Sequence, residues 1–241
     1  MPNDGEIDYD GFKKRGFLRS KEDGFFIFRA RMICGNFKAE QLVKIADIAS
    51  RYARGMVHMT VRQGVEVPFI RLNDIENVEK EAREAGILTG TSGPRLRAVT
   101  VCPGNNWCKS GLVNTFKLAE RLENERGISS GMELPHKFKI VISGCPNTCT
   151  RAQCSEIGVT GAVDISGNKK IGFAVYLAGS GGRMTKIGFK LDKIYSEDEV
   201  LDLIEIIVKF FKDNAEPRQR LGALIEKIGK DNFLKAVGIT V

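Results

Sequence analysis

Apolar and polar residues follow two periods in the first part of the chain, and these periods alternate. Over residues 25–33 every second residue is apolar and arginines occupy the other face, which is typical of a half-buried strand. Residues 39–53 place apolar side chains at helical spacing. Residues 56–67 return to strand character, and residues 73–85 predict a second helix that ends at a glycine. The pattern predicts the order strand, helix, strand, helix.

A unit of this order and length predicts a ferredoxin-like half domain at residues 24–88. The charged, glycine-containing residues 1–23 before it predict an N-terminal extended arm. A stretch rich in Gly, Thr and Ser over residues 86–94 indicates a boundary. Residues 89–241 then form the second domain.

The second domain mixes strands with helices. Ser196 and Glu199 form a capping box at the start of one helix. The predicted strands cover 96–101, 137–143, 171–177 and 184–190, and the predicted helices cover 111–125, 196–213, 217–228 and 230–237. Together with the first domain, this predicts the α+β fold class.

Composition narrows the class of protein. The 241 residues are 42% hydrophobic and 28% charged, which is ordinary for a globular protein and excludes disorder as the main state. Neither a membrane-spanning apolar stretch nor an N-terminal secretory pattern is present, so we expect a cytoplasmic protein. The net charge of +7 favours anionic partners, among them nucleic acid, an acidic cofactor or a small oxyanion.

Four of the six cysteines form two pairs, Cys102 with Cys108 and Cys145 with Cys149. Both pairs lie in loops containing Gly, Pro and Asn, where the backbone can fold around a compact group. Four thiolates are what an iron–sulfur cluster needs. The cysteines within each pair are separated by five and three residues, unlike the two-residue spacers of most zinc sites. A zinc site and unligated thiols are the alternatives. Cys34 and Cys154 lack a partner at a useful spacing and indicate buried structural cysteines.

The residues around these cysteines are more specific than the cysteine spacing alone. Residues 101–108 (VCPGNNWC) and 143–149 (SGCPNTC) resemble the siroheme and [4Fe-4S] signature of nitrite and sulfite reductases. Residues 58–66 (HMTVRQGVE) resemble the siroheme-contact strand of that family, and residues 134–139 (LPHKFK) resemble its substrate strand. By length the chain is similar to the small, single-half members, which include low-molecular-weight and dissimilatory-sulfite-reductase-like proteins.

The resemblance implies two cofactors, siroheme and a [4Fe-4S] cluster, held by residues 89–241. Cys102, Cys108, Cys145 and Cys149 would ligate the cluster, and Cys149 would also bridge it to the siroheme iron. Cofactor-binding roles fall, by the same resemblance, on His58, Thr60, Arg62, Gln63, Asn147, Gly181 and Arg183. For His58 a core histidine is an equal alternative, and the Gly179–Gly182 loop is equally consistent with an ordinary hairpin turn.

Basic residues provide an independent argument for an anion site. Three predicted strands carry basic pairs two residues apart, which places each pair on one face. Solvated strand faces are the simpler interpretation of any single pair, and burial of several unpaired cations in one pocket is costly unless an anion is bound. The three pairs are Arg29 with Arg31, Arg95 with Arg97 and Lys137 with Lys139. The resemblance assigns catalytic, anion-binding roles to Arg31, Arg97, Lys137 and Lys139.

The leading hypothesis is an oxidoreductase that reduces sulfite to sulfide with six electrons, and nitrite reduction to ammonia is the close alternative. A siroheme and iron–sulfur carrier without turnover is a second class. A nucleic-acid-binding module is disfavoured because no basic helix with interleaved aromatics is present. We expect a separate ferredoxin-like or flavoprotein electron donor, no membrane partner and a possible homodimer, since long family members combine two halves.

Overall fold

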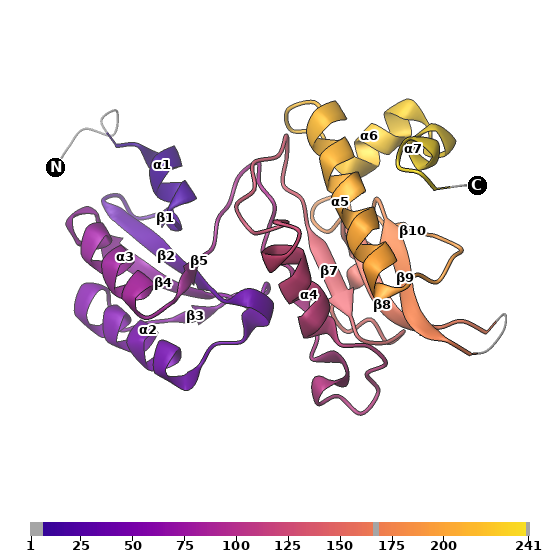
Figure 1. Ribbon diagram of the computed structural model, residues 1–241. Coiled ribbons are helices and arrows are strands. Elements are labelled where there is room, and N and C mark those ends of the chain that lie inside the picture. The colour runs from indigo at the N-terminus through magenta and orange to yellow at the C-terminus, as the bar shows by residue number, and fades with distance from the viewer. Residues whose placement is uncertain (1–6, 166–168, 240–241) are drawn as a thin grey trace. The chain divides into compact units, whose positions relative to one another are not determined.

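The computed structural model describes residues 7–165 and 169–239 (Figure 1). The chain divides into two compact units, unit 1 at Met1–Ser92 and unit 2 at Gly93–Val241. Each unit has its own sheet and its own helices.

In the described part of unit 1, antiparallel strands pair in the order β1-β2-β4-β3, with β5 also paired to β2. The strands are β1 (Phe17–Arg19), β2 (Phe25–Arg31), β3 (His58–Met59), β4 (Val65–Arg71) and β5 (Leu88–Thr89). The helices are α1 (Tyr9–Lys14), α2 (Ala39–Tyr52) and α3 (Ile75–Glu84). The predicted helices at 39–53 and 73–85 are therefore present within a few residues.

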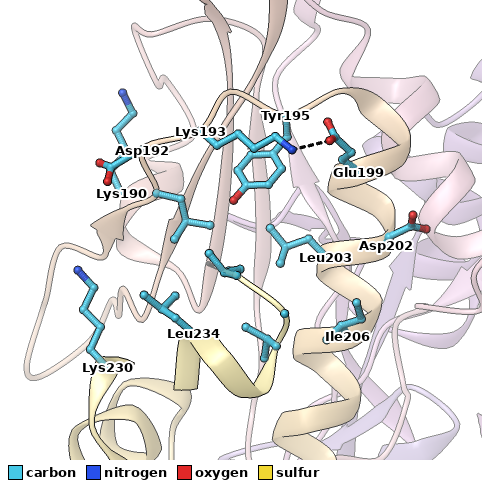
Figure 2. Close-up of a pocket in the computed structure, with 14 residues that line it drawn as sticks. Lys190, Asp192, Lys193, Tyr195, Glu199, Asp202, Leu203, Ile206, Lys230 and Leu234 are labelled. Atoms are coloured by element: carbon cyan, nitrogen blue, oxygen red, sulfur yellow. Dashed lines mark hydrogen bonds and ion pairs between the residues drawn. The ribbon is translucent and has the colours of Figure 1, made fainter. Parts of the chain in front are cut away.

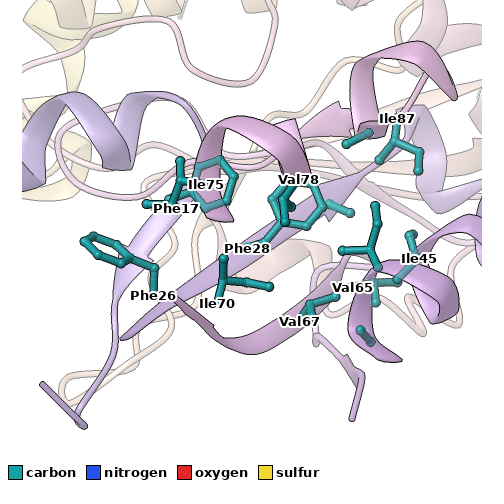
Figure 3. Packing of buried hydrophobic residues seen from close by; sticks show 14 residues of the cluster. Phe17, Phe26, Phe28, Ile45, Val65, Val67, Ile70, Ile75, Val78 and Ile87 are labelled. Atoms are coloured by element: carbon teal, nitrogen blue, oxygen red, sulfur yellow. The ribbon is translucent and has the colours of Figure 1, made fainter. Parts of the chain in front are cut away.

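The core of unit 1 forms where the apolar faces of α2 and α3 meet the sheet (Figure 3). Phe26 and Phe28 on β2 are at most 1% exposed, as the alternation predicts. Ile45 on α2 and Val78 on α3 are buried in the same cluster. Each large side chain buried here contributes about 1.5–3 kcal/mol.

The expectation of an extended arm at residues 1–23 is wrong for its described part, residues 7–23. Phe17 on β1 is fully buried and pairs with Phe28, with ring centroids 5.2 Å apart. Phe12 on α1 packs on Phe26 at a centroid distance of 5.2 Å. A six-residue helix and a three-residue strand are too short for periodicity to reveal, so the charged residues around the aromatics dominate the pattern.

Residues 56–67 form the β3–β4 hairpin rather than a single strand. His58 lies opposite Glu66, and Met59 lies opposite Val65. The turn is closed by the Gly64 amide, which donates to Thr60 Oγ1 at 3.1 Å. Gln63 adopts a left-handed conformation with φ of 61°. The predicted contact residues of this segment consequently lie on and beside a tight turn.

The described strands of unit 2 pair in the order β10-β9-β8-β7-β6. β6, β7 and β8 are parallel, and β8, β9 and β10 are antiparallel. Helices α4 and α5 pack against this sheet, and α6 contacts α7. The strands are β6 (Thr100–Val101), β7 (Ile140–Ser143), β8 (Ile157–Val163), β9 (Ile171–Leu177) and β10 (Phe189–Lys190). The helices are α4 (Thr115–Asn124), α5 (Glu197–Asn214), α6 (Leu221–Ile228) and α7 (Lys230–Ala236).

The main differences from the predicted elements of unit 2 concern strands. β8 has no counterpart among them because its first five residues are all buried, which removes the alternation. The strands expected at 96–101, 137–143 and 184–190 are shorter, and an isolated bridge joins Leu96 to Phe138. The capping box is confirmed, because the Ser196 amide donates to Glu199 Oε2 at 2.8 Å. Among the described residues, no helix combines the length and apolar character that crossing a bilayer requires.

Candidate functional site

The two cysteine pairs lie in loops that leave neighbouring parallel strands of unit 2. Cys102 directly follows β6, and Cys145 comes two residues after β7. β6 and β7 are paired with Val101 opposite Ile142. Because parallel neighbours end at the same edge of a sheet, both loops start from one edge.

Close backbone packing holds the two loops together. A Cβ atom at Gly144, the residue before Cys145, would lie 2.5 Å from the Gly104 Cα in the first loop. Gly104 has φ of 55°, and a Cβ atom there would lie 2.5 Å from the Val113 carbonyl oxygen. The Gly144 carbonyl also accepts a hydrogen bond from the Leu112 amide at 2.8 Å. Any side chain at these glycines would separate the loops.

The donor set fits an iron–sulfur cluster. All four thiols are free; Cys145 is buried, Cys102 is half-buried, and Cys108 and Cys149 are exposed. Cys102 Sγ accepts a hydrogen bond from the Gly144 amide at 3.0 Å, which links the first cysteine loop to the second. Among the described His, Cys, Asp and Glu side chains, no three are arranged around a single metal ion. A [4Fe-4S] cluster places one thiolate on each iron, so its ligands surround a larger object than one ion.

The second cysteine loop is fixed by an unusual backbone. Thr148 and Arg151 have φ of 42° and 55°, and such values are a real outlier for a β-branched residue. The Thr148 hydroxyl donates to Gln153 Oε1 at 2.6 Å and accepts from the Ala152 amide at 3.1 Å. Asn147, predicted to bind cofactor, is exposed at the outside of this loop. These contacts fix the direction in which Cys149 leaves the loop.

A pocket of about 580 Å³ in unit 2, here called the cationic pocket, gathers several predicted residues. Lys137, predicted to bind the anion, lines it together with Gly181 and Arg183, which are predicted to bind cofactor. Sequence reasoning missed Arg218 and Arg220, which line the same pocket from the segment before α6. These two arginines lie about eighty residues after Lys137 along the chain, so no local pattern connects them.

The cationic pocket has more positive charge than its acids neutralise. Arg220 pairs with the buried Glu156, and Lys186 pairs with Glu226 at 2.6 Å. Lys137, Arg183 and Arg218 form no ion pair with any residue that the structure describes. Unpaired cations in one pocket are typical of sites for anionic ligands, because the ligand offsets the desolvation cost.

His136 reports on this electrostatic environment. Burial lowers its pKa, and the nearby charges of Lys137, Arg220, Arg97 and Arg218 lower the pKa further. The histidine is therefore neutral at physiological pH and supplies an uncharged ring beside the cations. Since Arg97 and Lys137 both lower the pKa of His136, both cations lie near this ring. Arg97 is 8% exposed and donates to the Gly93 carbonyl at 2.8 Å.

Lys139 is separated from Lys137 by the fully buried Phe138, as the alternation predicts. Its backbone amide donates to Glu156 Oε2 at 3.0 Å. Lys139 is not among the residues that line the cationic pocket. The structure thus groups Lys137 with Gly181 and Arg183 at one pocket, whereas Lys139, two residues after Lys137, lies outside its lining.

The remaining predicted residues belong to unit 1. Arg31 is 8% exposed and donates from Nε to the Thr89 carbonyl at 3.2 Å. Thr60 and Gln63 form the hairpin turn described above, and Arg62 lies between them. Burial and then the charge of the neighbouring Arg29 lower the pKa of Arg62, against the opposite effect of Glu66.

His58 is exposed on β3, so the alternative of a core histidine is wrong. Within the same sheet, Arg29 serves a structural role because its Nη2 pairs with Glu66 at 2.6 Å. Of the basic pair on β2, Arg31 alone stays a candidate for ligand binding.

A further pocket of about 480 Å³ lies between α5 and α7 (Figure 2). Leu203 and Ile206 from α5 and Leu234 from α7 form its apolar wall. At its rim Lys193 pairs with Glu199 at 2.6 Å. None of the predicted site residues lines this pocket.

The packing of the cysteine loops gives a stability prediction. Gly144→Ala should lower the free energy of unfolding by about 3 kcal/mol, because backbone on both sides must move to admit the methyl group. Gly127→Ala is the matched control, since Gly127 has φ of 64° but no atom near its Cβ position, and should cost about 1 kcal/mol. Urea titration measures both values. Equal losses in the two variants would contradict tight packing of the loops.

Comparison with known proteins supports the assignment of both units. Residues 92–241 match the family model described as the nitrite and sulphite reductase 4Fe-4S domain. Residues 19–85 match the nitrite/sulfite reductase ferredoxin-like half domain. Siroheme and a [4Fe-4S] cluster are the cofactors of this family, in agreement with the prediction from sequence.

Curated relatives carry both activities in their names. The chain is 32% identical to a coenzyme F420-dependent sulfite reductase of Methanocaldococcus jannaschii, over 95% of this chain and 44% of that protein. It is 28% identical to a nitrite reductase [NAD(P)H] of Bacillus subtilis, over 87% of this chain and 24% of that protein. The chain thus spans less than half the length of these relatives. An assimilatory-type sulfite reductase of Nitratidesulfovibrio vulgaris is of similar size, with 25% identity over 92% of this chain and 97% of that protein.

Solved structures share the fold. Dissimilatory sulfite reductase I superposes with a TM-score of 0.80 at 16% identity, over 90% of this chain and 70% of that chain. The Mycobacterium tuberculosis NirA protein superposes with a TM-score of 0.81 at 18% identity, over 94% of this chain and 45% of that chain. With both predicted domains matched in order, the chain belongs to the nitrite and sulfite reductase family.

Proposed function

We propose that this protein is a siroheme- and [4Fe-4S]-dependent reductase that converts sulfite to sulfide with six electrons. One observation carries the proposal: the unit with the four family cysteines also contains a pocket lined by Lys137, Arg183 and Arg218, three cations that no acid among the described residues neutralises. A protein that only carries electrons has no need for such a pocket.

The cationic pocket is connected to the second cysteine loop through one segment. A Cβ at Gly179, in the glycine loop of the pocket, would lie 2.2 Å from the Gln153 carbonyl oxygen. Gln153 in turn accepts the hydroxyl of Thr148, the residue before Cys149. The anion pocket and a proposed cluster ligand are therefore supported by the same few residues.

Each group has a proposed role. Cys102, Cys108, Cys145 and Cys149 hold the cluster. When bound, the cluster and siroheme supply the electrons and the iron at which the anion is reduced. Arg183 and Arg218 suit the carboxylates of siroheme, since a guanidinium matches a carboxylate with two donors.

Lys137 is the proposed contact to the substrate anion. Its ammonium group stabilises the negative charge that accumulates as electrons arrive, and it can donate a proton. Removal of each sulfite oxygen as water consumes protons, so a cation that donates protons serves both needs. The roles of Arg31, His58, Thr60, Arg62 and Gln63, like those of Arg97, Lys139 and Asn147, stay predictions from the resemblance.

Nitrite reduction to ammonia is the second candidate, since a B. subtilis relative bears that name and both anions suit a cationic pocket. We place sulfite first because a relative of the same size is named a sulfite reductase. The electron donor is proposed to be a separate ferredoxin-like protein or flavoprotein. A homodimer is proposed as the assembly.

An anaerobic assay of the purified chain with a reduced dye and each anion tests the function. Iron, acid-labile sulfide and extracted tetrapyrrole are measured on the same sample. We expect both cofactors to be present and sulfite to yield sulfide. If the protein reduces nitrite but not sulfite, nitrite reduction is the function. If both cofactors are bound and neither anion is reduced, the protein is an electron carrier.

A further inference from the structure

Glu156 is a buried carboxylate that the roles above leave unused. It is 1% exposed and directly precedes β8. Its Oε2 accepts the Lys139 amide at 3.0 Å, and its Oε1 accepts Arg220 Nε at 2.8 Å. A carboxylate this far from water needs charged or polar partners to replace its hydration. Both oxygens of Glu156 have such a partner.

These contacts join three separate segments of the cationic pocket. The first is residues 137–139, held through the Lys139 amide. The second is the glycine loop, because Arg220 Nη1 also donates to the Gly181 carbonyl at 3.3 Å and the Glu156 carbonyl accepts the Ala178 amide at 3.0 Å. The third is residues 218–220, which precede α6. Glu156 thus joins the walls that carry Lys137, Arg183 and Arg218, through its carboxylate to Lys139 and Arg220 and through its backbone carbonyl to Ala178.

We propose that Glu156 is a positioning residue for the cationic pocket. Through its contacts with Arg220 and Lys139, it keeps the anion-binding cations in their relative positions. The inference rests on the proposed function, in which this pocket takes the siroheme carboxylates and the substrate anion. Glu156 touches neither ligand, and acts through the residues that do.

The sign of the expected effect separates positioning from simple charge. Removal of an acid makes a pocket more positive, and on charge alone any anion should then bind more tightly. If Glu156 acts by positioning, its removal should weaken anion binding despite the added positive charge. Glu226 provides the matched control, because it is an exposed acid of the same pocket whose partner is Lys186.

The test uses siroheme binding, followed by the fluorescence of Trp107, which is the only tryptophan of the chain. Full-length protein produced without siroheme is titrated with siroheme. Glu156→Gln should weaken siroheme binding roughly tenfold, as expected when a charged hydrogen-bonding partner is lost. Glu226→Gln should leave the affinity unchanged or raise it. Equal or tighter binding by Glu156→Gln would overturn the inference.

A double-mutant cycle tests whether Glu156 acts through Arg220. Arg220→Gln alone should weaken binding similarly, and the double variant should be no weaker than either single variant. Additive losses would overturn action through Arg220. If Glu156→Gln does not fold, Arg220→Lys tests the same contact, because it keeps the positive charge of the pocket but removes the two-donor fork that meets Glu156. Unchanged siroheme binding by Arg220→Lys would overturn the inference.

Steady-state kinetics add a second readout. In Glu156→Gln loaded with both cofactors, the KM for sulfite should rise more than kcat falls, because Lys137 is displaced but retained. A drop in thermal stability with unchanged affinity and KM would show a structural role only, and would overturn the inference while leaving the proposed function intact. Failure of the wild-type chain to bind siroheme would instead overturn the proposed function, and this inference with it.

Discussion

Cys145→Ala is expected to yield protein that has lost most of its iron and acid-labile sulfide, with anaerobic sulfite reduction lowered at least a hundredfold. Cys145 is the most buried of the four proposed cluster ligands, at 8% exposed, and lies just after β7 in the loop that packs on the first cysteine loop. Replacement of a residue that only contacts a metal ligand typically lowers metal affinity or activity about 10–100-fold. Loss of a thiolate that binds the cluster directly should have a larger effect. Metal and sulfide analysis of the purified variant measures the outcome.

Cys154→Ala is the matched control for this variant. Cys154 is a free, half-buried thiol that follows the same loop but is not one of the predicted ligands. It should retain wild-type iron, sulfide and activity. Equal iron loss in both variants, or full iron in Cys145→Ala, would show that the ligand assignment is wrong.

Lys137→Met should lower sulfite reduction by about 10²–10³-fold while the absorption spectrum of the bound cofactors stays the same. Methionine keeps the unbranched apolar stem of lysine and is one atom shorter, so the variant removes the ammonium group from the cationic pocket with little change in packing. Loss of one donor aimed at developing charge typically has an effect of this size. The spectrum and the dye-coupled assay, made on one preparation, separate binding from turnover.

Lys212→Met provides the comparison, since Lys212 is an exposed lysine in the last turn of α5 and lines none of the pockets described above. It should match the wild type in both measurements. Unchanged turnover in Lys137→Met would remove Lys137 from the substrate site. Loss of the siroheme spectrum would instead assign it to cofactor binding.

Local sequence signals were sufficient for the helices that have amphipathic faces or caps. The spacing of Ile45 and Ala49 predicts α2, and the capping box of Ser196 with Glu199 predicts the start of α5. Both signals are local, because they depend on residues three or four positions apart. The helix expected from residue 111 begins instead at Thr115, where the Asn114 side chain caps it by accepting the Lys117 amide at 2.9 Å.

Periodicity failed where burial or a turn removes it. β8 is buried over its first five residues and contains Gly158 and Gly161, so it lacks the alternation by which strands are recognised. Residues 56–67 have strand-like residues on both sides of a tight turn, so the hairpin resembled one strand until the left-handed Gln63 placed the turn. Phe17 is buried by its contact with Phe28, a partner that the pattern at residues 1–23 does not reveal.

The sequence by itself determined the family, the cysteine pairs and the pairing of basic residues, because each depends on residue types at short, fixed spacings. Only the tertiary structure decided that Arg218 and Arg220 join Lys137 and Arg183 at one pocket, and that Glu156 contacts Arg220 behind it, since these residues come from segments far apart along the chain. It also decided which of these cations are neutralised by an acid within residues 7–165 and 169–239 and which are not. The physical reason is that electrostatic environment depends on distance in space, and a chain of this kind brings distant segments together only when its sheet and loops have packed.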